Sequence, residues 1–378
     1  MIMTPGQAVQ IARKGLAELP LPSPDQQFYD AVRSEGFRRF PKRLENFDRF
    51  KSSERNKTCD YLPIKLDIEN VSRCNYRCTM CQVSEWPKMT RAADMSFEDF
   101  KTLIDEQYGL IEIKLQGMGE PALGGDSYYE MIGEARRRSI WVRSTTNASL
   151  LHLNDNIKKF VASDICELQV SIDGATKETY EAIRLGGRFE KVVENCSALN
   201  QHAEDVGRLR TRMWTVLQNE NLGELELFPE LAAKMGFNRL TLSLDLADWG
   251  QEHWQNHNDE IDCHQDFSVE RGLNLVRMGE ALGVEVTFWH VDEKYSTTSP
   301  DRLCPWPFER GFVSSDMRIV PCCMIANPDV CDLGDAKSFA SEWNGESIAN
   351  FRDLHLSGNI PKVCASCYSA PKAGRDTA

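Results

Sequence analysis

Long apolar runs, an excess of positive charge and low-complexity tracts are all absent from this sequence of 378 residues. No stretch approaches the roughly 18 consecutive apolar residues that mark a membrane-spanning helix. Charge and proline interrupt the first 40 residues before any apolar run develops, so we expect neither a transmembrane helix nor a signal peptide. The net charge of −13 argues against a general nucleic-acid binder.

Thirteen cysteines stand out in a chain that is 41% hydrophobic and 27% charged. Without a secretory signal we expect a reducing cytoplasm, where thiols serve as metal ligands or stay free instead of forming disulfides. One segment, residues 33–57, is basic, with nine Lys or Arg against four Asp or Glu. It is either a solvated helical arm or a docking patch for an acidic partner or phosphorylated substrate.

Stretches typical of strands and helices alternate after residue 60. The expected strands are 62–69, 110–116, 139–146, 166–173, 208–218, 239–246 and 285–291. The expected helices are 95–108, 127–138, 155–163, 175–183, 189–203, 222–235 and 268–282. Such alternation predicts a parallel sheet of right-handed βαβ units, here a partial (β/α)6 barrel of the TIM type. We expect a helical N-terminal extension (1–60), the barrel (61–295) and a small cysteine-rich β-hairpin and helix domain (296–378).

Three cysteines lie within eight residues in CNYRCTMC, at Cys74, Cys78 and Cys81. The segment follows the first expected strand, at the end where parallel barrels place their chemistry. Disulfides would leave one thiol over, and a tetrahedral zinc site would need a fourth ligand from elsewhere. Three thiolates can instead hold three corners of a 4Fe-4S cluster and leave the fourth iron open to a chelating small molecule.

CxxxCxxC after the first strand of a βα repeat resembles the radical S-adenosylmethionine (SAM) superfamily, over roughly residues 61–290. In that family the amino and carboxylate groups of SAM chelate the open iron. One electron from the cluster cleaves SAM to methionine and a 5′-deoxyadenosyl radical, which abstracts a substrate hydrogen atom. The resemblance implies an enzyme that uses a SAM-binding cluster, SAM and a one-electron donor such as flavodoxin or ferredoxin.

QGMGEP, STTNASLL and LQVSIDGATKETYEAIR match the family at later expected strand ends. By this similarity QGMGEP would receive the SAM amino group, and Ala148 replaces a usual glycine in the second segment. Met80 stands where an aromatic residue commonly covers adenine, and its thioether can cover a purine face too. The SAM contacts implied by the resemblance are Met80, Gly117, Gly119, Glu120, Asn147, Ser171, Asp173 and Arg184.

A second group of cysteines comprises Cys304, Cys322, Cys364 and Cys367. The stretch FVSSDMRIVPC predicts a hairpin with SSD as its turn, and four converging thiolates close either a 4Fe-4S cluster or a zinc site. The arrangement resembles the auxiliary-cluster domains called SPASM and twitch. The full SPASM pattern carries further cysteines and two clusters, whereas none follows Cys367. The resemblance therefore implies one auxiliary 4Fe-4S cluster.

Six further cysteines lie outside these two groups. Neighbouring residues on a strand point to opposite sides, so Cys323 faces away from the cluster if Cys322 binds it. Cys323 and Cys331 are either buried structural thiols or hydrogen-atom donors to a substrate radical. We expect structural roles for Cys59, Cys166, Cys196 and Cys263.

A polar loop at residues 246–267 follows the sixth expected strand, with Trp249, His253, Trp254, His257 and His264. It would hang over the active face as a lid that binds substrate and excludes water from a radical. A solvated surface loop is the plainer interpretation. A metal site at His253 and His257 is a third one.

The motifs leave the reaction open. An auxiliary cluster that accepts an electron would turn a substrate radical into a ketone. The twitch resemblance favours this oxidation, with a sugar or aminocyclitol as the substrate. Return of a hydrogen atom from the opposite face would instead give epimerisation. Alternatives are maturation of a ribosomally synthesised peptide and, in another class, a non-catalytic iron–sulfur or zinc scaffold. Residues 1–60 lack the strands of a winged-helix peptide-recognition domain. We therefore interpret the chain as a dehydrogenase or epimerase of a small polar molecule.

Overall fold

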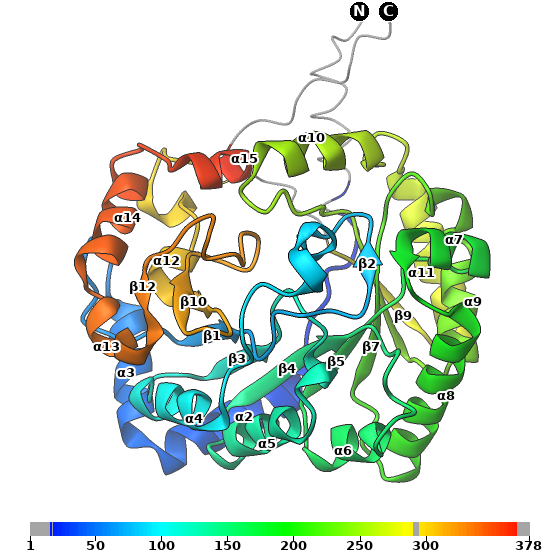
Figure 1. The fold of residues 1–378 in the computed structure, drawn as a ribbon, viewed down its shortest axis with the longest axis horizontal. Coiled ribbons are helices and arrows are strands. Elements are labelled where there is room, and N and C mark those ends of the chain that lie inside the picture. The colour runs from blue at the N-terminus through cyan, green and yellow to red at the C-terminus, as the bar shows by residue number, and fades with distance from the viewer. Residues whose placement is uncertain (1–15, 17, 290–294, 369–378) are drawn as a thin grey trace, which may run out of the picture.

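The computed structural model describes residue 16, residues 18–289 and residues 295–368. It contains a ten-stranded sheet in the order β12-β11-β10-β1-β3-β4-β5-β7-β8-β9 (Figure 1). All neighbours from β10 to β9 pair in parallel, which confirms the predicted partial barrel. Parts of the expected helical extension (1–60) and of the expected strand at 285–291 lie outside the described residues.

The ten strands of this sheet are β1 (Lys65–Ile68), β3 (Glu112–Leu115), β4 (Trp141–Thr146), β5 (Glu167–Ser171), β7 (Thr211–Val216), β8 (Arg239–Ser243), β9 (Glu285–Trp289), β10 (Arg310–Val313), β11 (Arg318–Val320) and β12 (Gly334–Asp335). The first seven fall at the predicted places with shorter bounds, β10 and β11 lie in the expected hairpin, and β12 was not predicted. Two short strands, β2 (Arg77–Cys78) and β6 (Arg184–Leu185), pair with each other apart from this sheet. Seven parallel strands therefore lie in the barrel region, one more than a (β/α)6 unit has.

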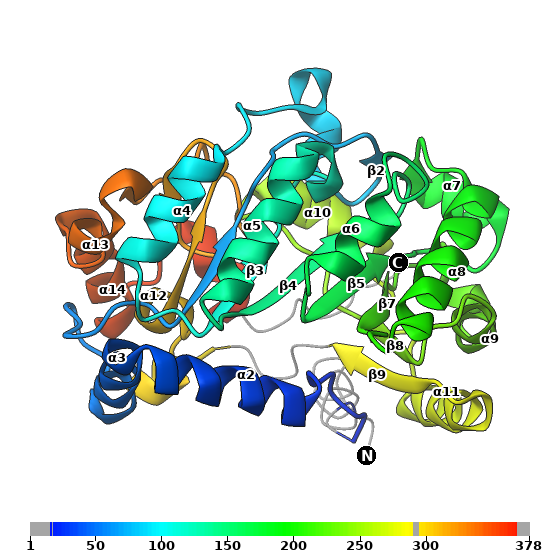
Figure 2. The same ribbon diagram turned by 90° about the horizontal axis from the view of Figure 1, so that it is seen from below.

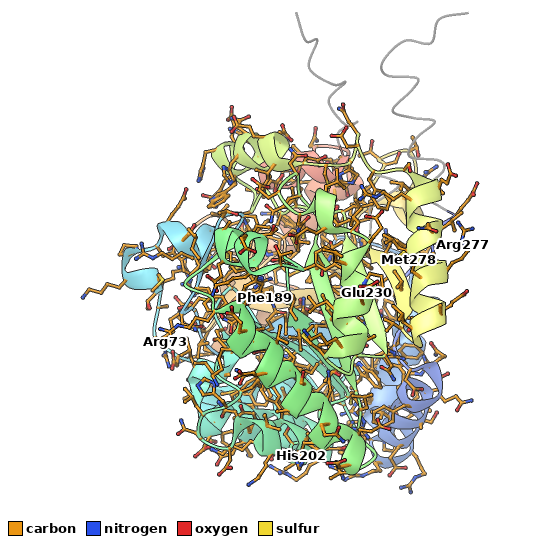
Figure 3. All side chains as sticks on the ribbon, turned by 90° about the vertical axis from the view of Figure 1, so that its right-hand side faces the viewer. Arg73, Phe189, His202, Glu230, Arg277 and Met278 are labelled. Atoms are coloured by element: carbon orange, nitrogen blue, oxygen red, sulfur yellow. The ribbon has the colours of Figure 1, made fainter. Side chains whose placement is uncertain are left out.

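Helices cover the outer face of the sheet, as Figure 3 shows for the long α8 between Phe189 and His202. Their starts follow from capping side chains, since Ser96 accepts from the Asp99 backbone N–H and Ser268 from that of Arg271. The helices are α2 (Gln26–Arg39), α3 (Pro41–Ser52), α4 (Phe97–Glu106), α5 (Asp126–Arg137), α6 (Asn156–Ala162), α7 (Lys177–Ile183), α8 (Phe189–Asp205), α9 (Leu227–Lys234), α10 (Glu252–Ile261), α11 (Val269–Leu282), α12 (Trp306–Glu309), α13 (Phe339–Glu342), α14 (Glu346–Leu356) and α15 (Ala365–Tyr368). No helix in the described part of the chain is both long and apolar enough to cross a bilayer.

The N-terminal arm closes one end of the barrel (Figure 2). The Tyr29 ring of α2 lies 5.0 Å from the ring of Trp141 at the start of β4, and its hydroxyl donates to Glu112 on β3 at 3.3 Å. Arg43 on α3 is buried and donates to the backbone carbonyls of Arg138 and Ser139. Arg43 of the basic segment 33–57 therefore packs against the barrel, and the N-terminal arm forms the floor of the barrel.

The C-terminal region joins the barrel sheet directly. β10 and β11 form the predicted hairpin around the Ser314–Asp316 turn, and β10 lies parallel to β1 with Leu66 opposite Gly311. The sheet therefore runs across the expected boundary at residue 295, and the division into three parts stays a prediction. The expectation of a loop throughout 246–267 was wrong, because α10 forms there with Trp254 and Asn258 on its buried side.

Glu112 at the barrel floor yields a stability prediction. Burial alone would raise its pKa, but Arg143 and Lys65, each 3.0 Å from the carboxylate, lower that pKa to about 2. A carboxylate with a depressed folded-state pKa stabilises the fold above its unfolded pKa of about 4.3, and this contribution disappears as the pH falls toward 2.

We expect Glu112→Gln to lower the free energy of unfolding by about 3 kcal/mol at pH 7, with a smaller loss at pH 3. Urea unfolding of both proteins, followed by far-UV circular dichroism at the two pH values, measures this difference. A loss of the same size at both pH values would contradict the assignment.

Candidate active site

The cysteine loop is fixed to the barrel by a small antiparallel pairing. Cys78 in β2 lies opposite Arg184 in β6, and the Thr79 N–H donates to the Ile183 carbonyl at 3.0 Å. The loop then turns back on itself, since the Cys81 N–H donates to the Cys78 carbonyl at 3.1 Å. This path brings the three predicted thiols into one neighbourhood at the carboxyl end of the strands.

The three thiols form a partly buried group of sulfur donors. Burial raises the pKa of Cys74 to about 12, and the carboxylate of Glu120 and the Cys78 thiol add to the rise. Burial likewise raises the pKa of Cys81, with Cys78 as the next cause. The Tyr76 backbone N–H donates to the Cys74 sulfur at 3.4 Å. Three soft donors with a backbone N–H on one of them fit a 4Fe-4S cluster that keeps one iron without a protein ligand.

In the described residues no three His, Cys, Asp or Glu side chains surround one point as a single metal ion requires. The donor set of Cys74, Cys78 and Cys81 is nevertheless all sulfur, the set that iron–sulfur clusters use. The radical SAM cluster and SAM are thus the cofactors that these residues suit.

Two glycines of QGMGEP allow β1 and β3 to approach closely at their ends. A Cβ on Gly117 would overlap the side chain of Glu69, and one on Gly119 would overlap the carbonyls of Val71 and Arg73. Arg73, labelled in Figure 3, immediately precedes the first cysteine. The structure therefore gives both glycines a packing reason, and their predicted contact with SAM stays a prediction.

Glu69 is a buried residue that the sequence analysis missed. Its carboxylate accepts from the backbone N–H of Met118 at 2.9 Å and of Ser315 at 3.1 Å, and it pairs with Arg91 at 3.3 Å. It therefore joins the ends of β1 and β3 to the turn of the C-terminal hairpin. An acidic residue directly after a buried strand was the only available signal, and that pattern is too common to single it out.

Glu120 is engaged by its own protein. One oxygen accepts from the Thr146 hydroxyl and the other from the Asn147 backbone N–H, each at 2.7 Å. Burial raises the pKa of this carboxyl, and these donors oppose the rise. Asn147 in turn donates to Asn75 of the cysteine loop at 3.0 Å. QGMGEP and STTNASLL are thereby tied to each other and to the cysteine loop.

Asp173 and Arg184 form a buried ion pair of 2.6 Å beside the thiols. Burial raises the pKa of Asp173 while Arg184 lowers it, and both residues act on the pKa of Cys78. The Arg184 Nε is buried and meets no hydrogen-bond acceptor among the described residues. Ser171 is the last residue of β5, two positions before Asp173, and it is partly exposed. Asp173 and Arg184 thus lie beside the cysteine loop, and the contacts of Ser171, Asp173 and Arg184 with SAM stay predictions.

The four predicted auxiliary thiols also meet. The pKa of Cys322 is raised by burial and by its neighbours Cys323, Cys304, Cys364 and Cys367. The Tyr295 hydroxyl is hydrogen-bonded to Cys304, and the Tyr368 hydroxyl accepts from the Cys304 N–H at 2.8 Å. Four sulfur donors fit a closed cluster. That this domain carries one cluster of the twitch kind stays a prediction.

Cys323 and Cys331 lie on different sides of the auxiliary thiols. Burial raises the pKa of Cys323 to about 11, and the next largest influences are Asp67 and Lys114 of the barrel strands. Cys331 is instead a neighbour of Cys364. Cys322 and Cys323 follow β11 and are not part of a strand, so the orientation expected from strand alternation and a hydrogen-donor role for either thiol stay predictions.

α10 and the residues before it lie against the cysteine loop. Trp249 Nε1 donates to the Met80 carbonyl at 3.3 Å, and His257 Nε2 lies 3.0 Å from the Thr79 carbonyl. Gln82, next to the last cysteine, is hydrogen-bonded to Gln251 at 3.3 Å and to the Ile325 carbonyl at 3.0 Å. The segment thus bridges the cysteine loop and the C-terminal region, while its two histidines each serve a separate contact.

This bridge predicts that α10 shields the cysteine loop. His257→Ala removes a partly buried hydrogen bond worth about 1 kcal/mol, so a cluster held by the loop should be lost roughly fivefold faster in air. The matched control is His253→Ala, because its pair with Glu85 is about half exposed (55% for both side chains) and contributes little. Loss of visible absorbance measures both rates, and equal rates in the two variants would contradict the shielding role.

Comparison with known proteins agrees with this geometry. A model of the Radical SAM superfamily matches residues 70–232, and one of the iron-sulfur cluster-binding domain called SPASM matches residues 304–368. The mycofactocin maturase MftC of Mycolicibacterium smegmatis is 27% identical over 233 residues, which cover 61% of this chain and 56% of that protein. A tungsten-containing aldehyde ferredoxin oxidoreductase cofactor-modifying protein of Pyrococcus furiosus is 27% identical over 173 residues, 44% of this chain and 46% of that one.

Solved structures share the fold. Streptococcus suis SuiB bound to precursor peptide SuiA superposes with a TM-score of 0.60 at 12% identity, covering 82% of this chain and 69% of that one. Native anSMEcpe with bound AdoMet gives 0.57 at 16% identity, with 78% and 84% covered. This chain spans slightly more than half the length of the mycofactocin maturases that it matches. Both matched regions contain the thiol groups described above, and the chain belongs to the radical SAM superfamily, with a C-terminal SPASM domain.

Proposed function

We propose that this radical SAM enzyme modifies a peptide. The observation that carries the proposal is the similarity to mycofactocin maturases over 61% of the chain. Proteins of the same fold have been solved with a precursor peptide, in SuiB, and with short peptides, in anSMEcpe. These relatives favour the peptide alternative over oxidation or epimerisation of a sugar or aminocyclitol.

We assign Cys74, Cys78 and Cys81 to the SAM-binding cluster. When bound, the cluster and SAM supply a 5′-deoxyadenosyl radical that abstracts a hydrogen atom from the substrate. Arg184 is the best candidate to hold the SAM carboxylate, because its buried Nε has no acceptor among the described residues. Asp173 fixes the guanidinium that would make this contact.

We assign Cys304, Cys322, Cys364 and Cys367 to the auxiliary cluster. Burial raises the pKa of Cys322, and the Tyr295 hydroxyl is hydrogen-bonded to Cys304. Hydrogen bonds to cluster sulfurs and exclusion of water are the means by which proteins set cluster potentials. The surroundings of the four thiols therefore suit a redox-active group near the substrate.

We expect the barrel, α10 and the C-terminal region to recognise the peptide. The described part of the N-terminal arm packs on the floor through Tyr29 and Arg43, at the end opposite the cysteine loop. α10 and the C-terminal region, in contrast, border that loop. A substrate that reaches the radical must lie against these elements.

Enzyme reconstituted without oxygen, and given SAM and a reductant, should form 5′-deoxyadenosine and change the mass of a precursor peptide encoded beside its gene. Mass spectrometry of peptide and nucleoside measures both products. Sugars and aminocyclitols serve as the comparison set. Conversion of one of these to a ketone or epimer, with every peptide unchanged, would contradict the proposal.

The two thiol groups should separate cleanly by mutation. Two clusters correspond to about eight irons per chain. Cys78→Ala should lower this to about four and abolish 5′-deoxyadenosine formation, whereas Cys364→Ala should also lower it to about four yet retain SAM cleavage. Iron analysis and nucleoside chromatography measure the outcome, and Cys166→Ala, a buried thiol outside both groups, is the control. Full iron in either cluster variant would contradict the ligand assignment.

A further inference from the structure

The inner face of the barrel keeps accessible surface that the outer face lacks. Along β3 and β4 the partly exposed side chains are Lys114, Arg143 and Thr145, while their neighbours Ile113, Leu115 and Val142 are fully buried in the core. Successive residues of a strand point to opposite faces. The side chains that keep contact with solvent are therefore those that line the inside of the barrel.

Near the floor, the charges of this inner face are mutually satisfied. Glu112 is shared by Lys65 and Arg143 at 3.0 Å each. Glu167 lies 3.7 Å from Arg212 and 3.6 Å from Arg239. Arg239 also lies 3.5 Å from Glu285, so the charges around Glu167 balance and the excess of positive charge lies around Glu112.

Higher in the barrel, Lys114 differs from the other lining cations. It lies opposite Asp67 in the register of β1 and β3, yet neither forms an ion pair within 4.0 Å with any described residue. Asp67 is only 6% exposed. Burial raises its pKa, and Lys114, Arg143 and Arg310 oppose the rise. The lysine and the aspartate are thus close enough to influence each other and remain open to a third group.

The balance of charge around Lys114 identifies the kind of group that is missing. Lys65, Lys114, Arg143 and Arg310 contribute four cations, and Asp67, Glu112 and Glu309 contribute three carboxylates, with Glu309 bound to Arg310. One further anion would make the set neutral. The charges of Asp67 and Lys114 also act on the pKa of Cys323 in the SPASM domain, and β10 of that domain pairs with β1, so the site borders the SPASM domain.

We propose that Lys114, with Arg143 beside it, binds a carboxylate of the substrate inside the barrel. This inference rests on the proposed function and names its substrate class, a peptide that presents an acidic side chain or its own C-terminal carboxylate to the lumen. A Lys ammonium on a flexible stem is a suitable point charge for such a group. Asp67 limits the site to one anion because it repels a second.

The test uses the reconstituted holoenzyme with SAM and two acetylated, amidated pentapeptides that differ only in Glu or Gln at the centre. Isothermal titration calorimetry should show the Glu peptide binding about tenfold more tightly. A Gln peptide with a free C-terminus tests whether the C-terminal carboxylate, instead of an acidic side chain, is the group that binds. Glutarate and glutaramide repeat the comparison without a peptide.

The variant is Lys114→Gln, which should remove the preference for the acid, and Lys114→Arg should retain it. The matched control is Lys65→Gln, since Lys65 faces the same lumen on the adjacent strand but is already paired with Glu112. Iron content and circular dichroism of each variant verify that it is folded and loaded.

Equal affinity for acid and amide in both the peptide pair and the glutarate pair, no binding of any of these four compounds, or an unchanged preference in Lys114→Gln would overturn the carboxylate site. If Glu and Gln peptides bind alike and are both modified, the site fails and peptide modification stands. If glutarate binds through Lys114 but no peptide is bound or changed, the site stands and the proposed function fails.

Discussion

The buried ion pair between Asp173 and Arg184 holds the cysteine loop in place, and the candidate site depends on it. Both side chains are at most 9% exposed, and their atoms approach to 2.6 Å. Arg184 also contributes its backbone to the strand pairing opposite Cys78. Removing one member would leave a buried charge without a partner, which is far more costly than the pair itself is stabilising. The loop therefore has one position relative to the strand ends, and its three thiols share it.

Paired buried charges also occur inside the barrel. A parallel sheet covered by helices on both faces is normally apolar throughout, whereas here the inner face carries Glu112, Arg143 and Lys114. Such a lining is tolerated because α2 seals the floor through Tyr29 and the carboxylates there are each shared by two cations. At the opposite end, α10 and the C-terminal region border the cysteine loop. The polar interior thus lies between a structural floor and the thiols.

Sequence patterns predicted the regular part of the molecule well. Alternating apolar periodicities located the barrel strands, and the cysteine spacings selected the thiols that the fold brings together. The helix α10 was missed because its polar sequence hides the buried Trp254 and Asn258. The role of Glu69 and the inward Lys114 were also beyond reach, since both depend on which strands become neighbours. Contacts between distant segments, such as β10 on β1, leave no local signature.

Electron paramagnetic resonance of the dithionite-reduced holoenzyme, recorded with and without SAM, tests the central claim most directly. The account requires one 4Fe-4S cluster with an iron that no protein thiol binds and a second cluster that four thiols close. SAM should therefore shift one of two overlapping signals and leave the other unchanged. A spectrum that SAM does not alter would contradict an open iron at Cys74, Cys78 and Cys81.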